Sequence, residues 1–141
     1  MLLSCNGSSS SQSTNVQIST SSITSEELSF RINDTKDGYI VMGIGMCNDI
    51  DIIIPSTYNG KNVVSIIDYA FSGCSSLNLI VIPDSVTSIG EDAFEYCYSL
   101  IIYCEANSEP SGWDSNWNSS NRPVYWADQW SYVDGVPTPN E

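Results

Sequence analysis

The chain has 141 residues, enough for one modest domain, and carries 17 acidic side chains against 4 basic ones, a formal net charge of −13. Nucleic-acid binding depends on lysine and arginine neutralising phosphates, so this charge argues against nucleic acid, and also against anionic lipid headgroups, as partners. The sequence has no histidine, the commonest general base and zinc ligand, and no apolar run approaches the ~20 residues of a membrane helix.

Residues 1–24 are predicted to form a disordered tether rich in serine and threonine. Leu2, Leu3, Ser4 and Cys5 have the form of a bacterial lipobox, in which apolar residues and a small residue precede a cysteine. The serine-rich tract that follows, from 8 to 22, contains too few apolar residues to order itself. Cys5 is therefore a candidate for lipidation, and a lipid anchor is the only membrane contact expected. The alternative is a disordered terminus with an incidental cysteine.

Residues 25–50 are predicted to form a β-hairpin that caps the repeats. Leu28, Phe30 and Ile32 alternate with polar residues, as in a half-buried strand. The segment NDTKDG, residues 33–38, is rich in turn-forming residues, and a second apolar run follows at 39–45. Two apolar runs joined by such a segment are typical of a hairpin.

Residues 51–106 contain a repeat. The segment IIDYAFSGCSSL begins at Ile66, and the near-copy IGEDAFEYCYSL begins 23 residues later, at Ile89. A fixed period of roughly 20–29 residues is typical of leucine-rich repeat solenoids, because stacked turns bury the apolar faces that one turn cannot bury alone. An apolar run ending in proline precedes each copy, at 52–55 and 80–83. The segment between the first run and the first copy is longer than the corresponding segment before the second copy, and Asn59 and Gly60 indicate a turn within it. The side chains expected to stack inward are Ile66 on Ile89, Ala70 on Ala93, Phe71 on Phe94, Cys74 on Cys97 and Leu77 on Leu100.

The segment IPDSVTSIGEDAFEYCYSL, residues 82–100, resembles the repeat of BspA-like leucine-rich repeat proteins, and the flanking segments extend the resemblance over about residues 28–126. The resemblance implies a mostly β fold: a short leucine-rich repeat solenoid with parallel strands, an N-terminal β-hairpin cap and a Trp-rich C-terminal cap. It also implies an extracellular or cell-surface protein that acts in adhesion by binding a protein, a host surface or matrix components. Members of this family are rarely enzymes, so no catalysis is expected. A purely structural role, as a repeat fragment with no ligand of its own, is an alternative to binding.

An apolar stripe is predicted on the outer side of the repeat strands. By alternation, Leu79 and Val81 point away from the interior when Ile80 and Ile82 point inward. Ile53 stands beside Val81 on the previous turn, and Tyr103 borders the stripe on the next. Because an exposed apolar patch often marks a partner surface, Ile53, Leu79, Val81 and Tyr103 are the candidate binding residues. Cover by a flanking segment, or a sheet buried on both faces, is the equal alternative.

The four tryptophans fall in residues 107–132. Trp113 and Trp117 are four residues apart, and Trp126 and Trp130 follow. We expect this segment to close the C-terminal end of the solenoid, since a short stack must protect both ends. The alternative is a carbohydrate-binding platform of exposed aromatic faces. Residues 133–141, rich in proline and polar side chains, are expected to be a flexible tail.

The cysteines are expected to pack inward as small apolar side chains. Cys74 and Cys97 occupy the same repeat position, and Cys47 lies at nearly the same place before the first copy. Stacked turns lie roughly 5 Å apart, so a disulfide between two of these stacked cysteines is the alternative. The sequence has neither a C-x-x-C motif nor an EF-hand loop, so no metal and no cofactor are expected.

Overall fold

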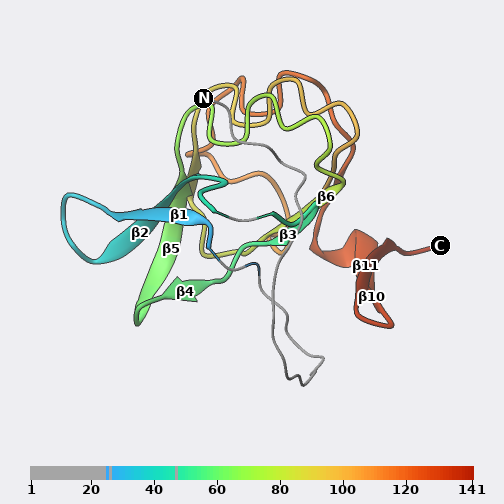
Figure 1. Ribbon diagram of the computed structural model, residues 1–141. Helices are drawn as coiled ribbons and strands as arrows, with labels where there is room; N and C mark the ends of the chain where they lie inside the picture. The colour runs from blue at the N-terminus through green and yellow to red at the C-terminus, as the bar shows by residue number, and fades with distance from the viewer. Residues whose placement is uncertain (1–24, 26, 47) are drawn as a thin grey trace, which may run out of the picture.

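The computed structural model describes residues 25, 27–46 and 48–141; the predicted tether, Cys5 and Cys47 lie outside these residues. In the described part of the chain the regular structure is β-strand, apart from one three-residue 3-10 helix, η1 (Ala127–Gln129). The chain winds in successive turns that stack on one another (Figure 1). Equivalent strands of neighbouring turns pair in parallel, which confirms the predicted mostly β solenoid.

One wall of the solenoid is a parallel sheet of four strands. In order, these are β3 (Asp51–Ile53), β6 (Leu79–Ile82), β8 (Ile101–Cys104) and β9 (Val124–Tyr125). The register aligns Ile53 with Val81, Val81 with Tyr103, and Tyr103 with Tyr125. The strands alternate as predicted: Ile52, Ile80 and Ile102 point into the core, while the aligned row points to the other face of the sheet.

Among the described residues, Ser25 covers the edge of this sheet at β3. The Ser25 backbone N–H donates to the Ile53 carbonyl at 2.9 Å. The Ile53 N–H in turn donates to the Ser25 hydroxyl oxygen, also at 2.9 Å. Ser25 is buried, and it satisfies both backbone groups of Ile53 that an edge strand would otherwise present to solvent.

The opposite wall is a mixed sheet that begins as the N-terminal cap. Strands β1 (Ser29–Ile32) and β2 (Gly38–Gly43) form the predicted antiparallel hairpin, and β2 pairs in parallel with β5 (Lys61–Ile66). Strand β4 (Thr57–Tyr58) folds back on β5, and β7 (Ser88–Ile89) continues the parallel pairing. Asn59 and Gly60 have positive φ angles of 50° and 80°, as a tight hairpin turn requires, so the turn predicted in the longer interval is confirmed.

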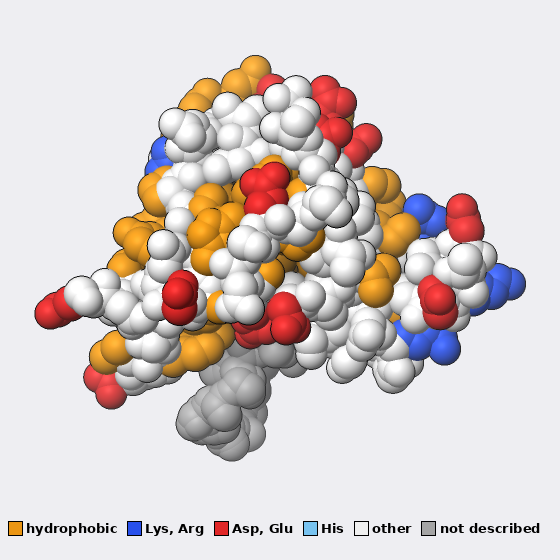
Figure 2. Space-filling model, turned by 180° about the vertical axis from the view of Figure 1, so that it is seen from behind, with side chains coloured by type: hydrophobic (Ala, Val, Ile, Leu, Met, Phe, Trp, Pro, Cys, Tyr) orange, Lys and Arg blue, Asp and Glu red, His pale blue; other side chains and the backbone are white. Residues whose placement is uncertain are grey.

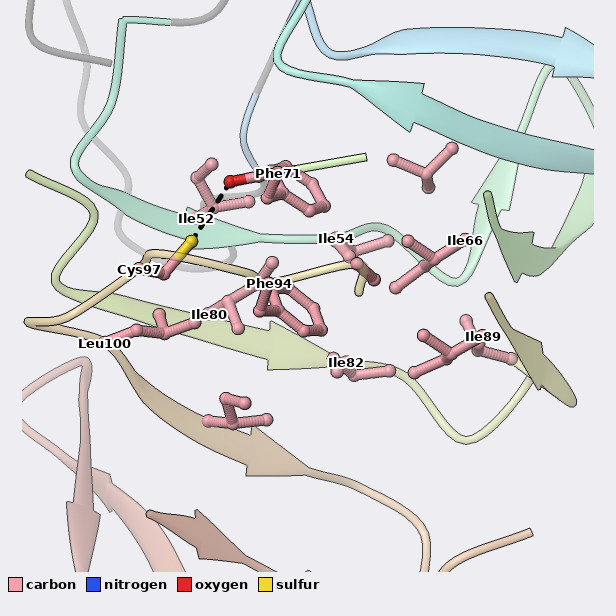
Figure 3. Close-up of a cluster of buried hydrophobic side chains, with 14 of the residues drawn as sticks. Ile52, Ile54, Ile66, Phe71, Ile80, Ile82, Ile89, Phe94, Cys97 and Leu100 are labelled. Atoms are coloured by element: carbon pink, nitrogen blue, oxygen red, sulfur yellow. Dashed lines mark hydrogen bonds between the residues drawn. The ribbon is translucent and has the colours of Figure 1, made fainter. Parts of the chain in front are cut away.

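The core lies between the two walls and repeats with the sequence. Phe71 and Phe94 are fully buried, and their rings stack in parallel with centroids 5.5 Å apart and an interplanar angle of 3°. Ile66 lies in register with Ile89, and Leu77 and Leu100 are buried in the same cluster. Figure 3 shows the isoleucines of the two walls on either side of the phenylalanines. The predicted inward ladders of aromatic and aliphatic side chains are therefore confirmed.

Hydrogen bonds between neighbouring turns fix the connecting segments at the top of Figure 1. The N–H groups of Tyr69, Phe71 and Gly73 donate to the carbonyls of Glu91, Ala93 and Glu95 at 2.8–3.0 Å. The next turn continues the series, since the Asp92 N–H donates to the Asn116 carbonyl at 3.1 Å. The tops of three successive turns are thus held against one another by their backbones.

Two tryptophans close the C-terminal end of the stack, as predicted. Trp113 forms a parallel bridge with Ile89, and its indole N–H donates to the Val86 carbonyl at 3.2 Å. The Trp117 ring meets Phe94 edge-on, with centroids 6.1 Å apart. Both tryptophans are buried. They take the place that the next repeat would occupy, which keeps the last phenylalanine of the ladder away from water.

The expectation of a flexible tail at residues 133–141 is wrong. The chain forms an antiparallel hairpin of β10 (Trp130–Val133) and β11 (Val136–Pro139). Asp134 and Gly135 make the turn, both with positive φ. Asp-Gly between two valines is a strong hairpin signal, and it outweighs the two prolines, which lie on one edge of a two-stranded ribbon.

Cys74, Cys97 and Cys104 are buried, as expected, and the disulfide given as the alternative is formed at Cys74 but not at Cys97. Cys97 and Cys104 are free thiols in buried positions. The Cys97 thiol donates to the Phe71 carbonyl at 3.0 Å (Figure 3).

Candidate interaction surfaces

The structure brings the four predicted binding residues together but does not expose them. Leu79, Val81 and Tyr103 are only 7 %, 1 % and 3 % exposed, and Ile53 is half-buried at their edge. The predicted direction of these side chains, away from the core, is correct. The expected exposed stripe is wrong, and cover by a flanking segment is the alternative that the structure supports.

The covering segment is the C-terminal hairpin, through Trp130. The Trp130 ring lies 5.2 Å from the Tyr103 ring, and its indole N–H donates to the Cys104 carbonyl at 3.0 Å. Tyr125 stacks on the other side of Tyr103 at 5.5 Å. Burial raises the pKa of the Tyr103 hydroxyl, so this residue stays neutral over the physiological range. Contact of a partner with this face would require the hairpin to move.

The tryptophan-rich end likewise offers no open aromatic platform. Trp113, Trp117 and Trp130 are buried, and Trp126 is half-buried against Trp113 at a ring distance of 5.8 Å. At the opposite end, Phe30, Tyr39 and Tyr58 pack on one another with ring distances of 4.1–6.4 Å. These three rings form the small core of the N-terminal hairpins, so their position has a structural explanation.

Three other tyrosines have no such explanation. Tyr69, Tyr96 and Tyr98 are 51 %, 52 % and 63 % exposed. They lie on the tops of two neighbouring turns, and the only ring contact recorded among the described residues for any of them is that between Tyr96 and Tyr98, 6.0 Å apart. We call the surface formed by these three residues the tyrosine face.

The sequence prediction missed the tyrosine face, although a comparison of the two repeat copies contains a signal. Tyr96 and Tyr98 stand where the first copy has Gly73 and Ser75. Gly73 and Tyr96 both have positive φ, 82° and 64°. A backbone position that suits glycine thus carries a large aromatic side chain in the second copy, and Tyr69, with φ 59°, is a second such case.

The charges around the tyrosine face are negative apart from Arg122, whose guanidinium acts on Cys97, between Tyr96 and Tyr98. Glu91, Asp92 and Glu95 raise the pKa of the Tyr69 hydroxyl, with Glu91 the largest contributor. Asp68 precedes Tyr69 on the first of the three turns, and Asp114 lies on the third. Residues 67–76, 90–99 and 112–121 contain no lysine or arginine; the basic residues of the chain are Arg31, Lys36, Lys61 and Arg122. Figure 2 shows acidic and exposed hydrophobic side chains together at the top of the molecule.

Several of these carboxylates are held in place by hydrogen bonds. Asp68 Oδ1 accepts from the Glu91 N–H at 2.9 Å, and Glu95 Oε1 accepts from the Ser72 hydroxyl at 3.3 Å. Asp114 Oδ1 accepts from the Asn116 N–H at 2.7 Å. The face therefore presents fixed negative groups beside aromatic rings.

The free thiols are poorly suited to nucleophilic chemistry. Burial raises the pKa of Cys97 to about 11 and that of Cys104 to about 12, so both stay protonated at neutral pH. Within the described residues, no group of three or more histidine, cysteine, aspartate or glutamate side chains is arranged to hold a metal ion.

Comparisons with known proteins agree with the fold. Residues 46–111 match the family described as BspA type leucine-rich repeat region (6 copies). A leucine-rich repeat protein of T. pallidum is similar in structure, with a TM-score of 0.53 and 25 % identity over 62 % of this chain and 44 % of that one. A leucine-rich repeat protein from Bacteroides capillosus is similar with a TM-score of 0.51 and 21 % identity, over 74 % of this chain and 96 % of that one. No curated protein matches the chain. No helix in the described residues is long and apolar enough to cross a membrane.

Proposed function

Because residues 46–111 are a leucine-rich repeat region of the BspA type, we propose that this protein is an extracellular or surface-displayed module that binds another protein. It has no catalytic activity of its own in this proposal, and its partner is a protein of a host surface, of the extracellular matrix or of another cell. The family is typically found on the surface of bacteria or secreted by them, and its repeat fold is typically not catalytic.

The observation that carries the proposal is the tyrosine face. Tyrosine is enriched in protein interfaces, because its ring gives a large rigid contact area and its hydroxyl a hydrogen bond. Tyr69, Tyr96 and Tyr98 are at least half exposed, and Tyr69 and Tyr96 have positive φ angles, which cost backbone strain for a residue with a Cβ. Strain that stability does not explain is a reason to look for a binding role.

Export has separate support from Cys74. This residue is disulfide-bonded, and disulfides form and persist mainly in oxidising environments outside the cytosol. Lipidation of Cys5 would hold the module at the cell surface, with residues 1–24 as the tether. A single acyl chain binds a membrane only marginally, so stable anchoring needs more than one chain.

Carbohydrate binding at the tryptophan-rich end is a second candidate with less support. Sugar stacking requires an open aromatic face, whereas three of the four tryptophans are buried and only Trp126 is partly accessible. A test of this candidate is glycan-array binding by the native protein and by Trp126→Ala. A loss of glycan binding with an unchanged melting temperature would favour it.

The proposed function is tested on an array of extracellular-matrix and cell-surface proteins. We expect the native chain to bind a defined subset, and the triple variant Tyr69→Ser, Tyr96→Ser, Tyr98→Ser to lose this binding. The control is Tyr132→Ser, which removes a tyrosine of similar exposure from the C-terminal hairpin. Equal binding by the triple variant, or the absence of any partner that discriminates between triple variant and control, would refute the role of the tyrosine face.

A further inference from the structure

Resting on the proposed function, we infer that the partner binds the tyrosine face through a segment rich in lysine and arginine. The inference concerns the chemistry of that segment, which the proposed function leaves open. It follows from three properties of the face: its aromatic rings, its fixed carboxylates and the distribution of charge over the molecule.

The rings provide a surface for a cation. The faces of tyrosine rings carry negative electrostatic potential, so they attract an ammonium or guanidinium group placed above them. The rings of Tyr96 and Tyr98 are 6.0 Å apart and inclined by 53° to each other. Two inclined rings of this kind can be reached by a flexible lysine or arginine side chain from the same segment.

The carboxylates complete the recognition. Glu91, Asp92 and Glu95 all act on the Tyr69 hydroxyl, so the first ring of the face lies within the field of three negative groups. Glu95 keeps its position through the Ser72 hydroxyl, which lowers the cost of ordering it on binding. A lysine or arginine side chain over these groups gains a charge pair and a ring contact together.

The distribution of basic residues leaves the face mostly negative, with Arg122 the one basic residue beside it. No lysine or arginine lies on the three turns at 67–76, 90–99 and 112–121, and the four basic residues of the chain lie in the N-terminal hairpins and at Arg122. The recorded ion pair of the described residues, between Arg31 and Asp34 at 3.9 Å, is also in the N-terminal hairpin. The carboxylates of the three turns outnumber Arg122, so the face keeps an excess of negative charge and a basic segment is the complementary partner.

The test uses a fluorescent peptide of alternating lysine and glycine, with a glutamate–glycine peptide as the probe of opposite charge. Binding to the full chain is followed by fluorescence anisotropy at low and physiological salt. We expect the lysine–glycine peptide to bind and the glutamate–glycine peptide not to bind. Binding of the lysine–glycine peptide should weaken as the salt concentration rises. In NMR spectra the amides of residues 67–75 and 90–98 should shift on its addition.

Two triple variants separate the tyrosine face from the overall negative charge. The variant Glu91→Gln, Asp92→Asn, Glu95→Gln removes three charges at the face and keeps side-chain shape. The control Asp34→Asn, Asp49→Asn, Asp128→Asn removes three exposed charges elsewhere. Since each 1.4 kcal/mol is a factor of ten in affinity, the loss of three favourable pairs should weaken binding about tenfold in the first variant, and much less in the control.

The outcomes distinguish this inference from the proposed function. Equal weakening in the two triple variants, or no binding of the lysine peptide, would overturn the inference, because the attraction would then be diffuse or absent. A protein partner that is lost on the tyrosine substitutions, but is acidic and indifferent to Glu91→Gln, would leave the proposed function standing and refute the inference alone. If the tyrosine triple variant and the carboxylate triple variant both lose binding on the protein array, the proposed function and the inference are both supported.

Discussion

Tyr96→Gly provides a decisive test of whether the tyrosine face serves binding or stability. Tyr96 has φ 64°, in the left-handed region, where a side chain with a Cβ costs roughly 1–2 kcal/mol. Glycine relieves this strain but loses about 0.5–1 kcal/mol through the greater entropy of the unfolded chain. The net expectation is a gain of about 0.5–1 kcal/mol in the free energy of unfolding, or about 2–5 °C in melting temperature.

The matched comparison is Tyr96→Ala, which removes the ring but keeps the Cβ. Because the Tyr96 ring is exposed and its recorded ring contact is with the exposed Tyr98, Tyr96→Ala should leave stability within about 0.5 kcal/mol of the native chain. Gly73, the equivalent residue of the first copy, gives the reciprocal test. A Cβ there would meet no atom within 4 Å, so Gly73→Ala should destabilise through its φ of 82° alone, by about 1 kcal/mol.

Urea denaturation followed by tryptophan fluorescence measures all three variants. If Tyr96→Gly proved less stable than both the native chain and Tyr96→Ala, the tyrosine would have a packing role and the reasoning above would fail. A more stable Tyr96→Gly that also binds partner less well would show that the ring is retained at a cost in stability.

Three further predictions address the core, the hairpin and the thiols. Phe94→Ala should lower the free energy of unfolding by about 3–5 kcal/mol in urea denaturation, because it empties a fully buried place between Phe71 and Trp117. Trp130→Ala should release the C-terminal hairpin, seen as faster amide exchange at residues 130–139 and increased binding of a hydrophobic dye, with a smaller loss of global stability. Cys97 and Cys104 should resist alkylation at pH 7.5 in the folded chain and react in urea.

The thiols also predict a pH dependence of stability. Burial raises the folded-state pKa of Cys97 from an ordinary value of 9.0 to about 11, so the folded state holds this proton when the unfolded state has lost it. The contribution is complete below pH 9 and is lost as the pH rises towards 11. The urea midpoint should fall over this interval more in the native chain than in Cys97→Ala.

Each of these predictions has a distinct contrary result. A Phe94→Ala variant as stable as the native chain would mean that the ladder does not carry the fold. Unchanged exchange in the hairpin of Trp130→Ala would show that other contacts hold it. Rapid alkylation of Cys104 at pH 7.5 would contradict its burial, and equal urea midpoints across the pH interval would contradict the linkage.

The sequence was sufficient to predict the repeating part of the structure. A period carried by Phe71 and Phe94 fixes which side chains stack, because equivalent positions of neighbouring turns meet the same surroundings. Alternation along β6 then separates Ile80 and Ile82 from Leu79 and Val81. These features follow from patterns within a few residues or at one constant spacing, and both are visible in a single sequence.

The structural features that the sequence analysis missed depend on contacts that do not repeat along the chain. Trp130 covers Tyr103 from 27 residues further along the chain, and no local pattern shows where a single tryptophan will dock. The hairpin that positions it did have a signal, Asp134 and Gly135 between two valines, which the nearby prolines obscured. The tyrosine face lies at exposed positions, where folding places little constraint on residue type and so leaves no signature of a core.

The two hydrogen bonds between Ser25 and Ile53 affect whether the molecule can remain monomeric. A parallel sheet with a bare outer strand is a template on which copies of the same chain can add, one after another, into a fibre. Ser25 occupies both backbone groups of Ile53, and at the other end of the stack Trp113 and Trp117 cover the core beside Ile89 and Phe94. Both features disfavour the addition of a second copy at an end of the solenoid.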